Sequence, residues 1–310
     1  MTRTTLRVGT RASLLATTQT RKFVQELQER FPELEIHEIT IQTLGDISTE
    51  PLSNSKTPGL FVSALRDALL RDEVDFIVHS MKDLPAQEHP QITTACVPLR
   101  EDSRDGLVSR DNLTLEALPT GAVVGTSSPR RSAILRKVRP DLHLKDIRGN
   151  IDTRIAKVQR GEYDATILAA AGLNRVGRSS EFAEIFPQES SVPAPGQGAL
   201  SVECRADDTV LAQMLHVLDD ATARLTTAAE RSVLVGLKAG CSTAIGAYAT
   251  HESGELRLIA ELGNAETGDF ERVELVEEVA LGRTEQATAM GINAAKMLLR
   301  SEIASKASFE

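Results

Sequence analysis

Short apolar runs alternate with amphipathic helical stretches through most of the chain. The run Leu6–Gly9 precedes a helical pattern that begins after Ser13, and Ala122–Gly125 precedes another that begins at Pro129. Ala165–Ala170 is a further run of strand length. Strands that are separated by helices usually pair in parallel, so the alternation predicts an α/β fold with largely parallel sheets.

Two pairs of short segments resemble each other within the chain. VGT occurs at 8–10 and again at 124–126, each time shortly before a serine and an arginine. An aspartate also begins an apolar run at 75–78 and at 164–167. Matches this short arise by chance too, so the sequence leaves open whether the architecture is duplicated. In either case polar residues follow the strand ends, where open α/β sheets bind ligands.

The net charge of −9 hides a basic segment. Residues 121–180 contain twelve Lys and Arg against five Asp and Glu, a net +7, which leaves −16 on the rest of the chain. Part of this charge is typical of a solvated helix face, and a nucleic acid is one candidate partner. However, nine of the twelve are Arg, the residue that grips carboxylate and phosphate in a bidentate way. Aromatic residues are only 3%. A small polyanion is therefore the favoured ligand.

Two motifs combine residue types that can do chemistry. Lys82 and Asp83 directly follow the apolar run Asp75–Ser80. They are either a helix N-cap or surface pair, or they place at the strand end a carboxylate, Asp83, that is able to shuttle protons. Ser128 is a good helix N-cap before Pro129, and the free N–H groups at such a helix start attract anions.

The cysteines and histidines exclude several kinds of site. Cys96 and Cys204 lie in strand-like runs, which predicts that both are buried. Cys241 lies between glycines and near Lys238, which favours an accessible thiol on a loop. The chain contains no CxxC pair and no closely spaced histidines, so neither a disulfide framework nor a metal site is predicted.

The remaining composition bears on location and mobility. The longest nearly apolar run, Ala165–Leu173, is nine residues, whereas a membrane helix needs about 20. The N-terminus has no secretory pattern, so we expect a soluble cytoplasmic protein without a membrane partner. The polar segment Gly45–Gly59 contains two prolines, which predicts a mobile lid or a disordered stretch.

Nine blocks together resemble the porphobilinogen deaminase (hydroxymethylbilane synthase) family over nearly the whole chain. The most specific blocks are VHSMKDLP at 78–85, GTSSPRR at 125–131 and RGNIDTR at 148–154. The others are RVGTRAS at 7–13, LGD at 44–46, GLFV at 59–62, ILAAAGLNR at 167–175, PAPGQGAL at 193–200 and AGCSTAIGAY at 239–248. The resemblance implies a transferase of porphyrin and heme biosynthesis. It would condense four porphobilinogen molecules with loss of ammonia and release the linear tetrapyrrole hydroxymethylbilane.

The resemblance also implies the cofactor and the site. A dipyrromethane primer, made from the substrate, would be attached to Cys241 by a thioether bond, and Asp83 would be the catalytic aspartate. The other positions that match cofactor-binding residues of the family are Lys82, Ser128, Arg130, Arg131 and Arg154. Those that match substrate-binding residues are Arg11, Ser13, Arg148 and Arg175. No metal is implied.

The implied fold has two α/β domains like the halves of a periplasmic binding protein around a cleft, and a smaller α+β domain. We expect domain 1 to comprise residues 1–98 and 193–216, domain 2 residues 99–192, and domain 3 residues 217–310. Pro/Gly-rich stretches at Pro98–Gly106 and Val192–Gly198 support the two crossings, and residues 251–310 are rich in acids. The family suggests a monomer.

The chain also departs from the family pattern. Asn54 and Pro58 stand where many relatives have lysines, which leaves Lys56 alone in the lid. Ser-Thr-Ala-Ile follows Cys241 in place of the more usual Gln/His-Val-Pro-hydrophobic, and Ala239 replaces a common glycine. Lid contacts and loop geometry are therefore expected to differ. The alternative function is a non-catalytic small-anion binding protein of the same two-lobed fold, which would not need Cys241.

Overall fold

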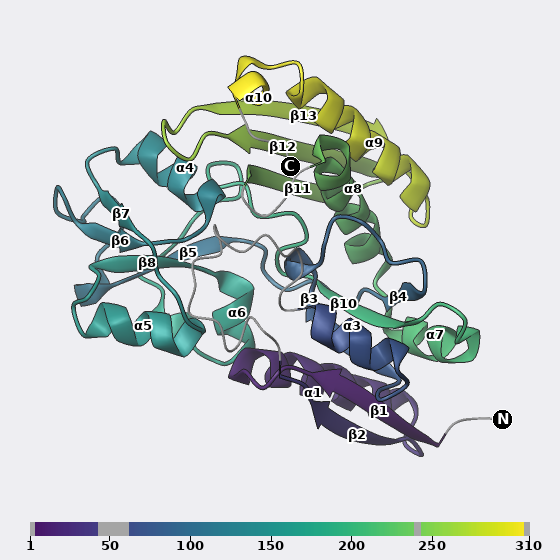
Figure 1. The fold of residues 1–310 in the computed structure, drawn as a ribbon. Helices are drawn as coiled ribbons and strands as arrows, with labels where there is room; N and C mark the ends of the chain where they lie inside the picture. Colours follow the sequence, from purple (N-terminus) through teal and green to yellow (C-terminus); the bar gives the residue numbers. More distant parts are fainter. Residues whose placement is uncertain (1–3, 43–61, 239–242, 307–310) are drawn as a thin grey trace. The chain divides into compact units, whose positions relative to one another are not determined.

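The computed structural model describes residues 4–42, 62–238 and 243–306 (Figure 1). The chain divides into two compact units. Unit 1 comprises residues 1–101 and 199–224, and unit 2 comprises residues 102–198 and 225–310. The predicted segment Gly45–Gly59, with Asn54, Lys56 and Pro58, lies outside the described residues.

Unit 1 contains one five-stranded sheet. Its strands are β1 (Thr5–Thr10), β2 (Glu35–Thr40), β3 (Phe76–Ser80), β4 (Ile92–Cys96) and β10 (Leu200–Arg205), in the order β2-β1-β3-β10-β4. Strand β1 pairs in parallel with β2 and β3, whereas β10 runs antiparallel to β3 and β4.

Helices cover both faces of this sheet. Helices α1 (Leu14–Arg30) and α7 (Thr209–Leu215) pack on one face, where Phe23 of α1 meets Phe76 edge to face at 6.1 Å between ring centres. Helix α3 (Ser63–Leu70) packs on the other face, against Ile77. Phe76 and Ile77 contact helices on different faces because successive side chains of a strand point to opposite sides of the sheet. Cys96 and Cys204 are buried on this sheet, which confirms their predicted packing role.

Unit 2 contains a second five-stranded sheet. Its strands are β5 (Asp105–Ser109), β6 (Val123–Gly125), β7 (His143–Lys145), β8 (Ala165–Ala169) and β9 (Glu184–Ile185), in the order β7-β6-β8-β5-β9. Helix α4 (Pro129–Val138) packs on one face, and helices α5 (Ile151–Gln159) and α6 (Ala170–Arg175) on the other.

The two sheets share one topology. Three strands pair in parallel in each (β2-β1-β3 and β7-β6-β8), and an antiparallel strand and an edge strand follow. The two VGT segments lie on the equivalent strands β1 and β6, and the two aspartate-led runs on β3 and β8, so the architecture is duplicated.

The prediction of largely parallel sheets is wrong. Each sheet has two parallel and two antiparallel pairings. Strands joined by a helical crossover must run in parallel, but β10 enters its sheet after the long return segment at 192–199, which leaves its direction free.

A third, smaller sheet completes unit 2. Strands β11 (Ala244–Glu252), β12 (Glu255–Gly263) and β13 (Phe270–Glu278) form an antiparallel meander. Its core is shared with helices α8 (Ala221–Leu237) and α9 (Thr284–Leu298), and the short α10 (Glu302–Lys306) follows. This confirms the predicted fold class, although β11 was not predicted. Where the chain is described, no helix is both long and apolar enough to cross a membrane.

Candidate functional site

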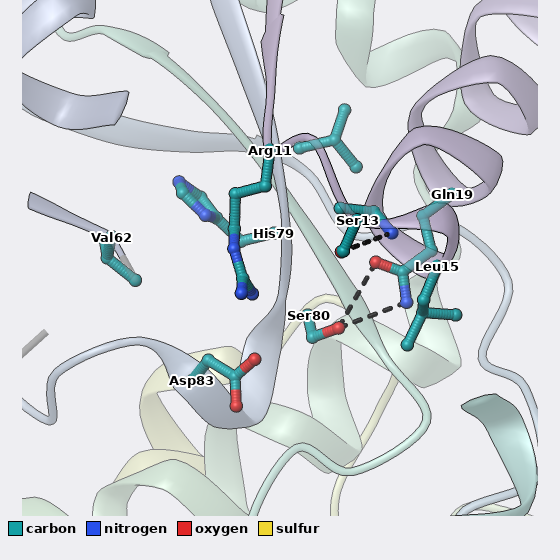
Figure 2. A pocket seen from close by; sticks show the side chains of 10 residues that line it. Arg11, Ser13, Leu15, Gln19, Val62, His79, Ser80 and Asp83 are labelled. Atoms are coloured by element: carbon teal, nitrogen blue, oxygen red, sulfur yellow. Dashed lines mark hydrogen bonds between the residues drawn. The ribbon is translucent and has the colours of Figure 1, made fainter. Parts of the chain in front are cut away.

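A small cavity opens in unit 1 at the carboxyl ends of β1 and β3 (Figure 2). Its volume is about 60 Å³. The residues that line it are Arg11, Ser13, Leu15, Ala16, Gln19, Val62, Val78, His79, Ser80 and Asp83. Three of the residues predicted from the sequence, Arg11, Ser13 and Asp83, are therefore brought together, although they come from two strand ends far apart in the sequence.

The first wall of the cavity is the start of α1. Ser13 is the N-cap of this helix, and its Oγ accepts a hydrogen bond from the backbone N–H of Ala16 at 3.4 Å. One turn further on, the Gln19 side-chain amide donates to the Ser80 hydroxyl at 3.1 Å. That bond joins α1 to the end of β3, as Figure 2 shows. Arg11 thus lies beside a helix N-terminus, a place that favours anions.

The second wall is a single 3₁₀ turn, Met81–Asp83, directly after β3. The backbone N–H of Met81 donates to the Ala199 carbonyl at 3.0 Å, and the Met81 side chain is buried. Leu84 closes the turn with a 3.1 Å bond from its N–H to the Met81 carbonyl. The turn is therefore anchored while Asp83 itself remains exposed. Lys82 is half-buried in the same turn.

A buried ion pair lies behind β3. Glu203 on β10 is 2% exposed and accepts two hydrogen bonds from Arg66 of α3, at 2.6 and 2.9 Å. Its Oε2 is also 3.6 Å from Nε2 of His79. Arg66 and Glu203 were not predicted, because 137 residues separate them and neither stands in a recognisable motif. His79, Ser80 and Gln19 were also missed, although His79 and Ser80 lie within VHSMKDLP.

Two predicted arginines of unit 2 surround a buried aspartate. Asp105, at the start of β5, is fully buried and accepts from Arg130 at 2.6 Å and from Arg131 at 2.7 Å. The same arginines donate to the carbonyls of Val192 and Ile167, each at 2.8 Å. The sequence therefore selected two arginines that also hold the fold, and it missed their counter-ion.

The Asp105 carboxyl has a strongly shifted pKa. Burial acts to raise this pKa, but the Arg130 and Arg131 guanidiniums more than offset burial and hold it well below its usual range. Gln197 adds a 3.0 Å hydrogen bond to the same carboxylate. One negative charge thus faces two positive charges, so the group carries a net +1. Nε of Arg131 is buried with no hydrogen-bond partner among the described residues.

The remaining predicted residues of unit 2 lie at helix ends and turns. Ser128 is the N-cap of α4, as predicted, with Pro129 in the first turn; its Oγ accepts from the Arg131 N–H at 3.4 Å. Arg175 at the end of α6 donates to the Gly198 carbonyl at 2.6 Å. Arg154 on α5 donates through Nε to the Gly149 carbonyl at 2.9 Å.

The turn between β7 and α5 requires a glycine. Gly149 has a φ of +111°, and a Cβ there would lie 2.6 Å from the Thr153 side chain. Beside it, Nε of Arg148 is buried and has no hydrogen-bond partner in the part of the chain that the structure describes. Arg148 therefore lies in this turn and Arg154 is hydrogen-bonded to it from α5, while Nε of Arg148 is left unsatisfied. Cys241 and Ala239 lie outside the described residues, so their predicted roles have no structural counterpart here.

Fold and cavity together define an α/β protein with a duplicated sheet, in which an acid and an arginine line one cavity. Residues 6–213 match the family model "Porphobilinogen deaminase, dipyromethane cofactor binding domain", and residues 224–300 match "Porphobilinogen deaminase, C-terminal domain". The chain belongs to the porphobilinogen deaminase family.

Curated relatives agree over most of the chain. Porphobilinogen deaminase of Brevibacillus brevis is 45% identical over 297 residues, which cover 94% of this chain and 93% of that protein. The Acidothermus cellulolyticus enzyme is 49% identical and covers 82% and 78%. Porphobilinogen deaminase 1 of Streptomyces coelicolor is 50% identical and covers 80% and 79%. Among solved structures, a Salmonella typhimurium periplasmic binding protein aligns with a TM-score of 0.40 at 12% identity, covering 70% of this chain and 92% of that one.

Proposed function

We propose that this chain is a porphobilinogen deaminase (hydroxymethylbilane synthase). It would condense four porphobilinogen molecules, each with loss of ammonia, and release the linear tetrapyrrole by hydrolysis. The observation that carries the proposal is the cavity of unit 1, where Asp83 and Arg11 share one lining with the cap of α1. A family match along both parts of the chain supports it.

Asp83 is the group that we assign to the chemistry. Each addition breaks the aminomethyl C–N bond of a substrate, with the electron pair leaving on nitrogen as ammonia, forms a C–C bond, and removes one ring proton. A carboxylate in the anchored turn after β3 would stabilise the positive charge that develops on the substrate as ammonia leaves, and would accept the ring proton afterwards. Being exposed, Asp83 can reach a ligand without moving the turn.

The basic side chains would bind the acetate and propionate groups of the pyrroles. In unit 1 this role falls to Arg11, beside the α1 N-terminus, with Ser13 as a hydrogen-bond partner, and to Lys82. In unit 2 it falls to Arg130, Arg131, Arg148, Arg154 and Arg175, with Ser128 as a hydrogen-bond partner. The net +1 of the buried group around Asp105 and the unsatisfied Nε atoms of Arg131 and Arg148 support this assignment.

The residues present also fit a dipyrromethane cofactor. Its carboxylates match the arginine-rich donor set of unit 2, and its pyrrole N–H groups match the Asp83 carboxylate. When bound, it would supply the pyrrole carbon that acts as nucleophile. Cys241 would hold it covalently, with Lys82, Asp83, Ser128, Arg130, Arg131 and Arg154 as non-covalent contacts.

We further propose three domains, residues 1–98 with 193–216, 99–192 and 217–310. A cytoplasmic monomer that needs neither metal nor nucleic acid is the form we expect. Membership of the family supports this part of the proposal.

The decisive experiment measures intact mass and ammonia release after incubation with porphobilinogen. The wild type should carry a covalent increment of at least two condensed pyrroles on the peptide that contains Cys241, and Cys241→Ser should not. Unchanged mass and no ammonia from folded wild-type protein would instead favour the anion-binding protein.

Asp83→Asn tests the assigned acid. It should keep its fold and lower turnover by about 10²-fold or more, because a positioned proton-transfer group contributes on that order. Asp207→Asn, in the exposed turn after β10, is the matched control and should leave turnover unchanged. If Asp83→Asn keeps more than a tenth of the wild-type turnover, the Asp83 carboxylate does not have the assigned role.

A further inference from the structure

His79 is a buried histidine beside the proposed reactive acid. Its side chain is 4% exposed, and Nε2 is buried without a hydrogen-bond partner among the residues that the structure covers. It stands on β3, next to Ser80 and four residues before Asp83, and it lines the cavity with both. Figure 2 shows these side chains around the cavity. A polar ring in this place needs a physical reason, because burying an unpaired polar group costs free energy.

The charged groups around His79 belong to four different elements. Glu203 of β10 faces Nε2 at 3.6 Å, and Arg66 of α3 binds the same carboxylate with two hydrogen bonds. On the cavity side, Asp83 of the 3₁₀ turn and Arg11 after β1 also act on the ring. Two acids and two arginines therefore surround the imidazole, and their charges balance.

Burial keeps this imidazole uncharged. Desolvation lowers the pKa of His79 to about 4, although Glu203 acts to raise it. Glu203 is weakened as a partner for a positive ring because Arg66 already satisfies both of its oxygens. It remains close enough to orient a neutral ring, since an N–H that faces a carboxylate is favoured over a lone pair that faces it.

We propose that His79 is a positioning residue for the site around Asp83: a neutral imidazole whose proton the Glu203–Arg66 pair keeps on Nε2. Nε2 lies 3.6 Å from Glu203, too far for a hydrogen bond, but close enough for the carboxylate to set the orientation of the ring beside Ser80 and Asp83. The neutral ring also adds no positive charge beside Asp83, where the reaction must stabilise a cation. This second consequence rests on the proposed function, whereas the tautomer and the charge of the ring do not.

The state of the ring can be measured without any turnover. In protein labelled with ¹⁵N at histidine, the imidazole shifts report charge and tautomer, and the His79 signals are those missing from His79→Gln. We expect a neutral ring with its proton on Nε2 from about pH 8 to about pH 5. The exposed His37 on β2 gives a reference signal in the same spectra. In Glu203→Gln the preference for Nε2–H should be lost. A His79 ring that is protonated at about pH 6.5, or that carries its proton on Nδ1, would overturn the proposal.

Kinetics test the positioning role. Gln at position 79 can still present an N–H to Glu203, so His79→Gln should keep a turnover number close to that of the wild type. Leu cannot, so His79→Leu should lower kcat by about tenfold or more with little change in KM, because small misplacements of a reacting group are costly. His37→Gln is the control. Equal losses in His79→Gln and His79→Leu, or none in either, would contradict the role.

The two experiments fail separately. If the wild type does not turn over porphobilinogen, the proposed function is wrong, but the NMR experiment still decides the state of His79. If turnover is normal and the ring is charged, only the present inference is wrong.

Discussion

The sheets of units 1 and 2 have the same strand order but place their buried charges differently. In unit 1, Glu203 on β10 is neutralised by one arginine, Arg66, and faces a neutral histidine. In unit 2, Asp105 on the equivalent strand β5 faces two arginines, Arg130 and Arg131. The first group is electrically balanced, and the second keeps one positive charge.

Under the proposed function, this difference would suit the two sheets to different tasks. Balanced buried charge behind β3 would add no net charge beside Asp83, the carboxylate that we propose to stabilise a cation. Excess positive charge in unit 2 suits the binding of carboxylates. The two units therefore share one strand order and differ in a few buried charged side chains.

The largest effect should come from removing the counter-ion of unit 2. Asp105→Asn leaves two buried guanidiniums without a compensating charge, so we expect the free energy of unfolding to fall by about 3–5 kcal/mol. Urea denaturation measures this loss. Glu162→Gln, which breaks the exposed pair with Arg160, should cost no more than about 1 kcal/mol. Similar losses for both variants would mean that burial does not determine how much the Asp105 ion pairs contribute to the free energy of unfolding.

The pH dependence of the same group has a defined sign. Because the folded-state pKa of Asp105 lies below the ordinary value, its contribution is complete above the unfolded pKa of about 3.9 and is lost as the pH falls below that value. Unfolding measured down to about pH 3 should therefore show a steeper acid loss in the wild type than in Asp105→Asn.

His79 should give the next largest effect, in a different pH window. Its folded-state pKa is about 4, and that of an unfolded histidine is about 6.5. Below about pH 6.5 the unfolded chain binds a proton that the folded chain does not, so stability should fall by up to about 3 kcal/mol as the pH approaches 4. Urea titrations at several pH values check this. His79→Gln should flatten the curve between these two pH values.

The smallest effect should come from the two helix N-caps that follow the equivalent strands β1 and β6. Ser13 and Ser128 each accept a 3.4 Å hydrogen bond from the backbone N–H three residues on. Replacing either with Ala should cost about 1 kcal/mol of unfolding free energy. Thermal unfolding of both variants should give losses of similar size. Clearly unequal losses would show that the two caps are not energetically equivalent.

Local patterns predicted several individual elements of this fold. Ser13 and Ser128 cap α1 and α4 as expected, and the runs around residues 75–80 and 165–170 form β3 and β8. These predictions succeed because capping, apolar period and turn residues act within a few positions of the chain. Strand β11 was missed, and the antiparallel direction of β10 was not foreseen, since neither depends on local sequence alone.

The site divides in the same way. The sequence by itself determined that Asp83 follows a buried strand, that arginines gather at 121–180, and that VHSMKDLP, GTSSPRR and RGNIDTR mark the family. Only the tertiary structure decided that Arg66 pairs with Glu203 behind His79, and that Arg130 and Arg131 share Asp105. These partners come together through sheet pairing and helix packing. The energy of a buried charge depends on what folding places beside it, and no local pattern records that.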